Sequence, residues 1–426
     1  MLESHFLIAS CVFAGVYGVL IWDKFNRAVV ALLGATLLVI LGVLNQEKAV
    51  EGVDFNTLGL LIGMMIIIAV CGRTGMFQYL AIKSAKVANG NPWRLMVMLG
   101  IVTAFLSALL DNVTTVLLMA PLTILFAEEM KVDFYPFLVV EIFTSNIGGT
   151  ATLIGDPPNI MIGSAANLSF MDFVENLALP VIVILAVTLV PVYFIWGKRL
   201  SVTDDVKERI MAFKERDAIK DTVLLKKCLG VLAIVIGGFL LQRQLHLEPA
   251  TIALFGAAVL LFLTGDDIHE ISTKVEWTTI FFFTGLFIIV KGIEEVGLIS
   301  MLASKLMDIT AGNKMIMVLS VLWVSAVASA FIDNIPFVAT MIPLIKEVGA
   351  QMGGQDAVMP LWWALSLGAC LGGNGTMIGA SANVVVAGIS ERAGRPFSFI
   401  EYMKTAFPLM ILSIIISTVY LYLFYL

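Results

Sequence analysis

Apolar runs of bilayer length recur along the whole chain. In the first half they cover residues 5–22, 28–45, 57–72, 135–165 and 177–197. A helix needs about 20 apolar residues to cross a hydrocarbon core of about 30 Å. Because lipid offers no hydrogen bonds, a crossing segment must satisfy its own backbone groups, so these runs predict helices. The sequence therefore predicts an all-α polytopic membrane protein.

Composition supports this class and excludes others. Hydrophobic residues make up 59% of the chain and charged residues 14%, whereas soluble proteins carry about 25% charged residues. So few basic residues, nearly all in loops, exclude nucleic acid as a partner. The first run is interpreted as a span, because no basic segment precedes it and no small-x-small cleavage site follows it. The four cysteines show no CxxC spacing and are interpreted as small core residues.

The second half of the chain repeats the first. The offset is 222 residues up to a short insertion near residues 353–354, and 224 residues after it. Matched pairs include Gly63 and Gly285, Asp111 and Asp333, Gly148 and Gly372, and Asn159 and Asn383. A constant offset through loops and spans indicates a duplication. The predicted domains are a first repeat at 1–197, a linker at 198–227 and a second repeat at 228–426.

Basic residues predict the orientation of these repeats. The linker holds nine Lys and Arg in thirty residues, so the positive-inside rule places it in the cytoplasm. If residues 95–126 form a hairpin that enters and leaves by one face, each half has five spans and the second half is inverted. Most basic loop residues of the first half then share the linker side: Lys24, Arg27, Arg73, Lys83, Lys86, Arg94 and Lys131. Two full spans instead of the hairpin would scatter these charges.

This arrangement predicts an integral protein of a prokaryotic plasma (inner) membrane, with both termini outside. Each of the two inverted repeats then has five transmembrane spans and one re-entrant hairpin, and membrane lipid surrounds them. In the second repeat the hairpin covers 317–348 and the broken span 358–390. In the first repeat the corresponding segments are 95–126 and 135–165.

Polar, glycine-rich sequence interrupts the apolar pattern twice in each half. The interruptions are the hairpin tips, 110–115 and 332–337, and two stretches within spans, 145–159 and 372–383. Irregular backbone inside a membrane persists only where protein or a water-filled cavity surrounds it. Paired interruptions in repeated segments are typical of a midplane transport site. We expect 148–159 and 372–383 to be non-helical and to face the tips across a polar cavity.

The candidate ligands for substrate and ion are the polar residues of these segments. They are Asp111, Asn112, Thr114, Thr115, Thr150, Thr152, Asp156 and Asn159 in the first half, and Asp333, Asn334, Asn374, Thr376, Ser381 and Asn383 in the second. Neutral amide and hydroxyl oxygens suit Na⁺, which we expect near Asn112 and Asn159, and near Asn334 and Asn383. No cofactor other than Na⁺ or H⁺ as coupling ion is expected.

The aspartates at the two tips are candidates for coupling. Asp111 and Asp333 each precede a helical run, where an aspartate cap alone contributes about 1 kcal/mol. A charge at the bilayer centre costs about 2.5–3.5 kcal/mol, and Ser or Asn would cap a helix without that cost. An ionisable residue at both tips therefore indicates a proton or cation role. Asp156 and Glu141 are further candidates, with a turn-making role for Asp156 and a lone protonated or paired carboxyl at Glu141 as alternatives.

At these motifs the sequence resembles the ion transporter superfamily, most closely its branch of arsenite permeases and pink-eyed dilution P proteins. The residues that carry the resemblance are Leu-Asp-Asn-Val-Thr-Thr at 110–115, Gly-Gly-Thr-Ala-Thr-Leu-Ile-Gly-Asp-Pro-Pro-Asn at 148–159 and Asp-Asn-Ile-Pro-Phe at 333–337. The superfamily also includes D-type sodium/proton antiporters and citrate and dicarboxylate transporters. The resemblance implies a homodimer in which a mobile transport domain moves against a scaffold as an elevator.

The tip aspartates also bear on the expected substrate. The dicarboxylate relatives have serine at this tip position, and a carboxylate there would repel an anionic substrate by about 4 kcal/mol at contact. We therefore expect gradient-driven efflux of arsenite or antimonite, or transport of a related small inorganic solute. A sodium/proton antiporter and an anion channel are the alternatives. An intramembrane aspartyl protease is disfavoured, since no Gly-x-Gly-Asp motif occurs, and the chain is not expected to be an enzyme.

Overall fold

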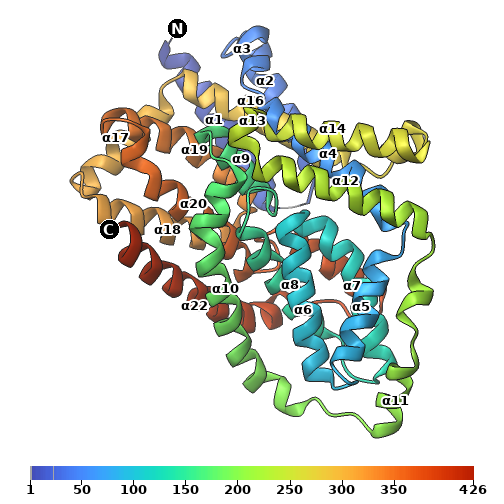
Figure 1. Cartoon of the computed structure of the whole chain (residues 1–426). Helices are drawn as coiled ribbons and strands as arrows, with labels where there is room; N and C mark the ends of the chain where they lie inside the picture. Colours follow the sequence, from blue (N-terminus) through green and yellow to red (C-terminus); the bar gives the residue numbers. More distant parts are fainter. Residues whose placement is uncertain (1, 23) are drawn as a thin grey trace.

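The computed structural model describes residues 2–22 and 24–426, and this part of the chain is helical, without strands (Figure 1). The first half contains α1 (Leu2–Trp22), α2 (Arg27–Ile40), α3 (Gln46–Glu51), α4 (Phe55–Gly72), α5 (Met76–Val87), α6 (Pro92–Leu109), α7 (Asn112–Glu129), α8 (Tyr135–Thr150), α9 (Pro157–Ala166) and α10 (Phe170–Ile195). The linker contains η1 (Gly197–Arg199), α11 (Asp204–Ala212) and η2 (Glu215–Ala218). The second half contains α12 (Thr222–Leu240), α13 (Gln242–Leu245), α14 (Pro249–Thr264), α15 (Ile268–Ser272), α16 (Trp277–Glu295), α17 (Leu298–Thr310), α18 (Lys314–Phe331), α19 (Asn334–Gln351), η3 (Gln355–Val358), α20 (Met359–Gly372), η4 (Gly373–Gly375), α21 (Ser381–Arg392) and α22 (Phe399–Tyr425).

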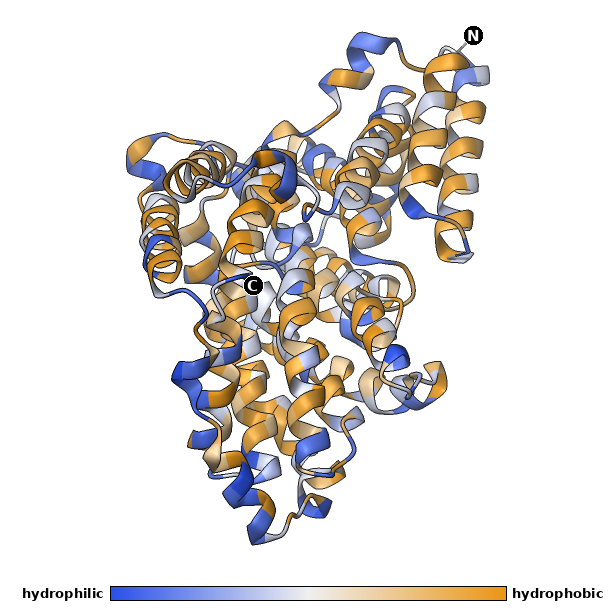
Figure 2. Cartoon of the chain, turned by 90° about the vertical axis from the view of Figure 1, so that its right-hand side faces the viewer, coloured by the Kyte–Doolittle hydropathy of each residue, from blue (hydrophilic) through white to orange (hydrophobic). Residues whose placement is uncertain are grey.

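The surface of the helices is apolar enough for a bilayer. In the described residues, nine helices of 18 residues or more are long and apolar enough to cross a membrane. Large apolar side chains lie on the outside, with Phe262 87% and Ile309 82% exposed. Figure 2 shows hydrophobic residues along most helices and hydrophilic residues gathered mainly at helix ends and loops. The prediction of an all-α polytopic membrane protein is confirmed.

Contacts between the halves follow the sequence repeat. Helix α4 crosses α14 at Gly63, where an added Cβ would lie 2.7 Å from the carbonyl carbon of Ala253. Helix α16 crosses α2 at Gly285, where an added Cβ would lie 2.6 Å from the carbonyl carbon of Ala31. At the offset of 222 residues the second contact is the first with the halves exchanged. Such an exchange is what a pseudo-twofold relation produces, and the orientation of each half across the membrane stays a prediction.

The first hairpin returns to the segment beside which it starts. Helices α6 and α7 are separated only by Leu110 and Asp111, and Asp111 is buried. Beside the start of α6, Gly90 packs against the backbone of Lys207 in the linker. Near the end of α7, the ring centroid of Phe126 lies 5.9 Å from that of Phe213, also in the linker. In Figure 1 this linker, with α11, lies at the end of the molecule opposite the N-terminus.

The two breaks are shorter than expected. Helix α8 continues to Thr150 and α9 begins at Pro157, so only 151–156 is non-helical in the first half. In the second half, η4 follows α20 directly and only 376–380 lacks helical structure. The prediction that all of 148–159 and 372–383 is non-helical is therefore wrong. Pro157 and Pro158 do not lengthen the break, because they occupy the first turn of α9, where the missing N–H has no partner in any case.

The paired glycines have a packing role in these helices. A Cβ at Gly148 would lie 2.1 Å from the carbonyl oxygen of Ala104 in α6. A Cβ at Gly372 would lie 2.5 Å from the carbonyl oxygen of Ala326 in α18. Each glycine thus lets a broken helix touch the backbone of its own hairpin, while the helix itself stays intact.

Candidate functional site

The hairpin tips and the two breaks meet in the interior of the protein. Helix α9 packs on α19, and α21 packs on α7, so each half-helix after a break lies against the hairpin of the other half. The backbone N–H of Asn112 donates to the carbonyl of Gly155 at 3.1 Å. The tip and the break therefore touch directly. The expected polar cavity between the tips and the breaks stays a prediction, and a small pocket beside the second tip is lined by Asp333 and by Ile378 of the second break.

A network of buried amides joins the two halves. The side-chain amide of Asn112 donates to the Asn146 oxygen at 3.1 Å. The Asn146 amide donates to the oxygens of Asn374, at 3.0 Å, and Asn383, at 2.9 Å. All four side chains are buried. Sequence reasoning named three of these residues as candidates and missed Asn146, which links them.

Asn159 and Asn383 hold the breaks in shape. The Asn159 amide donates to the carbonyls of Thr150, at 3.1 Å, and Thr152, at 2.9 Å. In the other half the Asn383 amide donates to the carbonyls of Gly373, at 2.7 Å, and Thr376, at 2.9 Å. The same residue in both halves thus ties a half-helix to the loop that precedes it.

The oxygens of these two asparagines already accept hydrogen bonds. The Asn159 oxygen accepts from the Ser366 hydroxyl at 2.6 Å and from the Cys370 thiol at 3.5 Å, and the Asn383 oxygen accepts from Asn146. With both lone pairs of Asn159 engaged, this conformation does not offer that oxygen to Na⁺, and the expected sodium site near Asn159 stays a prediction. Cys370 stands at the repeat position of Asn146, so the same position in each half contacts an asparagine of the other half.

Three of the six predicted hydroxyls donate hydrogen bonds to backbone carbonyls. Thr150 donates to the carbonyl of Asn146 at 2.7 Å, one turn earlier in α8. Thr152 donates to the carbonyl of Ala108 at 2.5 Å, and Thr376 donates to the carbonyl of Ala330. In this conformation these three hydroxyls therefore stabilise the backbone around the breaks and do not point to a ligand.

The three aspartates have different surroundings. Asp111 accepts a hydrogen bond from the N–H of Thr114 at 2.9 Å, so this residue does cap helix α7. Asp156 lies 3.4 and 3.5 Å from the amide nitrogen of Asn334. Within the described part of the chain, neither of these two carboxylates forms an ion pair.

Asp333 differs from both because it has a cationic partner. Its Oδ2 accepts from Arg27 at 2.6 Å and from the Ser381 hydroxyl at 3.0 Å, and its Oδ1 accepts from the N–H of Ile335 at 3.0 Å. The sequence places Arg27 in a cytoplasmic loop, and the side of the membrane on which it lies stays a prediction. Its side chain turns to a hairpin tip 306 residues away, a contact that no local pattern indicates.

Three polar atoms at the site have no partner among the described protein atoms. They are Oδ1 of Asn112, Oγ1 of Thr115 and Nδ2 of Asn374. Buried polar atoms are nearly always hydrogen-bonded to protein or water, so these atoms mark where a ligand or water is accommodated. The described residues contain no cluster of three or more His, Cys, Asp or Glu that could hold a metal ion. The free groups are thus one acceptor, one hydroxyl and one amide donor.

Glu141 lies apart from this network. It is buried in α8, and neither of its carboxyl oxygens has a hydrogen-bond partner. No hydrogen bond joins it to a tip or a break among the described residues. The structure therefore does not bring Glu141 into the site, although a buried carboxyl without partners favours its neutral form.

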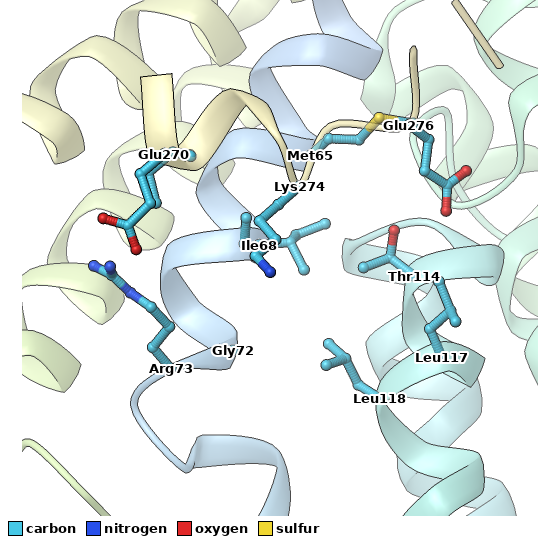
Figure 3. Close-up of a pocket in the computed structure, with 12 residues that line it drawn as sticks. Met65, Ile68, Gly72, Arg73, Thr114, Leu117, Leu118, Glu270, Lys274 and Glu276 are labelled. Atoms are coloured by element: carbon cyan, nitrogen blue, oxygen red, sulfur yellow. The ribbon is translucent and has the colours of Figure 1, made fainter. Parts of the chain in front are cut away.

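A cleft leads from the linker side to the first tip (Figure 3). Its volume is about 330 Å³, and α4, α7 and the segment from α15 to α16 line it. At one end Thr114 and Glu276 lie close together, and at the other Arg73 lies near Glu270 (Figure 3). Outside the spans, Arg73 also pairs with Asp266 and lowers the pKa of that carboxyl.

A second cleft, of about 360 Å³, is the repeat-related counterpart of the first. Its residues Phe287, Val290 and Ala339 stand at the positions of Met65, Ile68 and Leu117. The first cleft includes Thr114 of tip 110–115, whereas the second includes no residue of 332–337. Of these two clefts, only the first includes a residue of the tip of its own half, whereas a separate small pocket beside Arg27 is lined by Asp333 and Pro336 of the second tip.

Comparisons with known proteins agree with this architecture. A family model described as citrate transporter, CitMHS, matches residues 17–368. The chain belongs to the CitMHS family. A transporter of Mycobacterium tuberculosis named as uncharacterized, Rv2684, is 44% identical over 98% of both chains. The human P protein is 35% identical, and its match covers 98% of this chain and 60% of the P protein.

A solved structure shows the same fold. The YdaH transporter of Alcanivorax borkumensis aligns with a TM-score of 0.63, at 14% identity, over 95% of this chain and 97% of that one. The CitMHS chain described here is thus an integral membrane transporter and not an enzyme. The predicted membership of the ion transporter superfamily is confirmed, and the resemblance to P proteins is borne out by sequence identity.

Proposed function

We propose that this CitMHS transporter is a secondary active transporter of a small inorganic solute, driven by the proton or sodium gradient, with arsenite and antimonite as the first candidates. The observation that carries the proposal is the pair Asp111 and Asp156, two buried carboxylates without a cationic partner in the described structure. A buried carboxylate either takes up a proton or binds a cation. Either event lets an ion gradient act on the site.

The electrostatics of the site disfavour a free polycarboxylate. The site has three aspartates and one guanidinium, so its formal charge is negative when the aspartates are ionised. A trianion such as citrate, which gives the matching family model its description, would meet a repulsion of about 4 kcal/mol per contact at a surface-like dielectric. A cation or a neutral solute meets no such repulsion.

The unpartnered atoms suit a neutral hydroxide. Such a solute, As(OH)₃ for example, has hydroxyls that both donate and accept. They can donate to Oδ1 of Asn112, exchange a hydrogen bond with Thr115 and accept from Nδ2 of Asn374. Filling all three would remove the cost of about 1–3 kcal/mol that each buried unsatisfied group imposes.

Sodium/proton antiport is the second candidate. The same carboxylates, Asp111 and Asp156, favour it because an exchanger needs a group that holds either a proton or a sodium ion. In that case Oδ1 of Asn112 and the hydroxyl of Thr115 would complete the shell of the ion. We further propose, on the family resemblance, a homodimer with an elevator movement and an inner-membrane location with both termini outside.

The test is a flux panel in proteoliposomes that contain the full chain. Arsenite, antimonite, sodium, chloride and citrate are each measured with and without a pH gradient and with and without a sodium gradient. Arsenite or antimonite flux that requires a gradient, and that Asp111→Asn abolishes, supports the proposal. Asp204→Asn is the matched control, because Asp204 lies exposed in the linker with its side chain 91% accessible.

Other outcomes overturn the proposal. Gradient-driven citrate accumulation without arsenical flux would contradict the electrostatic reasoning. Sodium flux coupled to protons in the absence of any solute would establish the second candidate instead. Chloride flux that follows only the membrane potential would mean that the chain is a channel.

A further inference from the structure

The two hairpin tips share a sequence motif but differ in charge compensation. At the second tip, Asp333 is paired with Arg27, and only 6% of the aspartate side chain is accessible. The repeat position of Arg27 in the second half is Pro249. Among the described residues no guanidinium pairs with Asp111 at the first tip, and its side chain accepts a hydrogen bond from the N–H of Thr114. In this part of the chain the two tips therefore differ, since a tethered cation pairs with Asp333 and none pairs with Asp111.

This ion pair connects two separate parts of the fold. Arg27 is the first residue of α2, which packs on α16. Asp333 lies between α18 and α19, at the tip of the second hairpin. Nearby, the Tyr17 hydroxyl of α1 donates to the carbonyl of Pro336 at 2.7 Å and lies 2.7 Å from the Thr340 hydroxyl. Helices α1 and α2 thus hold the second tip by polar contacts in this conformation.

The contacts of Asp333 leave little room for another cation. Oδ1 accepts from Ile335, and Oδ2 accepts from Arg27 and Ser381. Among the described residues, Asp156 also lies near this tip, where the amide of Asn334 contacts it. A mobile cation can therefore bind Asp333 only when the guanidinium of Arg27 has moved away, so the two occupants exclude one another.

We propose that Arg27 is a tethered competitor for the coupling cation at Asp333. While the pair is formed, α2 clamps the second tip and the cation is excluded. When a sodium ion or a proton takes the carboxylate, the clamp opens and the second hairpin is released from α1 and α2. By linkage, the cation then shifts the protein away from the conformation described here. This inference rests on the proposed cation-coupled function and assigns the release step to one residue.

The experiment measures cation binding to the purified full chain and needs no transport. Thermal midpoints are recorded against sodium chloride at fixed pH, with choline chloride keeping ionic strength constant, and against pH in choline alone. The first series detects sodium and the second detects protons. In Arg27→Gln the competitor is gone, so the half-saturating concentration of the responding cation should fall by about tenfold or more.

Three further variants keep the test decisive. Arg27→Lys keeps the tethered charge and should stay close to the wild-type value. Asp333→Asn and the double variant Arg27→Gln/Asp333→Asn lack the carboxylate, so the gain in cation affinity should be absent from both. Arg243→Gln is the matched control, because it removes a guanidinium that pairs with Asp172 elsewhere in the chain.

Two results would overturn the inference. One is a half-saturating concentration in Arg27→Gln that equals that of the wild type, which would make Arg27 a structural anchor only. The other is a gain in affinity that persists in the double variant, which would place the cation elsewhere. If Arg27→Gln does not fold, Asp333→Asn still tests the inference, because a cation response equal to that of the wild type would place the cation away from Asp333. A failed flux panel with an intact binding result would refute the proposed solute and leave the competitor standing.

Discussion

Replacing Asn146 by alanine removes three hydrogen bonds from the amide network at once. The Asn112 nitrogen loses its acceptor, and the oxygens of Asn374 and Asn383 lose their donor. All three groups are buried. Each buried polar group left unsatisfied costs about 1–3 kcal/mol. Three such groups predict a loss of roughly 3–9 kcal/mol, and water entering the space left by the side chain would reduce it toward the lower limit.

The matched control is Cys370→Ala, at the repeat position of Asn146. It removes one thiol contact of 3.5 Å to the Asn159 oxygen, and that oxygen keeps its bond from Ser366. The expected cost is therefore that of a small buried side chain, about 1 kcal/mol. The two halves provide the same position with very different hydrogen bonding.

The assay is thermal unfolding in detergent, together with titration by a denaturing detergent, for wild type and both variants. Asn146→Ala is expected to unfold well below Cys370→Ala, with a difference of at least about 2 kcal/mol. Equal stability of the two variants would refute the conclusion that the amide network holds the halves together. It would also mean that the polar atoms of the site are hydrated and do not depend on Asn146.

Three other predictions follow from the geometry. Asp111→Asn should keep the thermal midpoint within a few degrees, since asparagine caps a helix nearly as well, but it should lose gradient-driven flux. Wild-type flux with unchanged pH dependence would contradict a coupling role for Asp111 and point to Asp156 or Glu141. Gly63→Ala should destabilise the protein by about 1–3 kcal/mol, because the new Cβ would lie 2.7 Å from the carbonyl carbon of Ala253. Gly18→Ala, where an added Cβ meets no atom within 4 Å, should be neutral or stabilising in the same unfolding assay. Lys86 lowers the pKa of Glu215 below the usual 4.5, so their ion pair stabilises the linker above that pH and is lost as pH falls through the lowered pKa. Protease cleavage of the linker should therefore become faster in acid, and equally fast cleavage of Lys86→Gln and wild type at pH 7 would contradict this.

The sequence by itself determined much of the fold and the location of the site. Hydrophobic run length predicted the helices that cross the membrane, because backbone satisfaction in lipid is a local requirement. The boundary between α6 and α7 at Asp111 was readable from an aspartate before a helical run. The repeat offset paired the tips and the breaks. Asn112, Asn374 and Asn383, which belong to one network, were all candidates from the sequence.

The tertiary structure decided what each of these residues does. A glycine pair can break a helix or admit a neighbour, and only the position of Ala104 shows that Gly148 does the second. The extent of the breaks was therefore overestimated. Similarly, the sequence predicts Asn159 as a sodium ligand, whereas in the structure its side-chain oxygen accepts a hydrogen bond from Ser366 on another helix.

The pairing of Asp333 at the second tip with Arg27 was the feature that only the tertiary structure could show. Arg27 and Asp333 lie 306 residues apart, and no local pattern links them. As a basic residue between two spans, Arg27 fits a cytoplasmic loop, and the positive-inside rule concerns the sum of such residues. Whether one side chain stays in water or turns to a buried carboxylate depends on the packing of α2 against α16 and on where the hairpin comes to rest. That packing is set by contacts between the halves, which a sequence does not list.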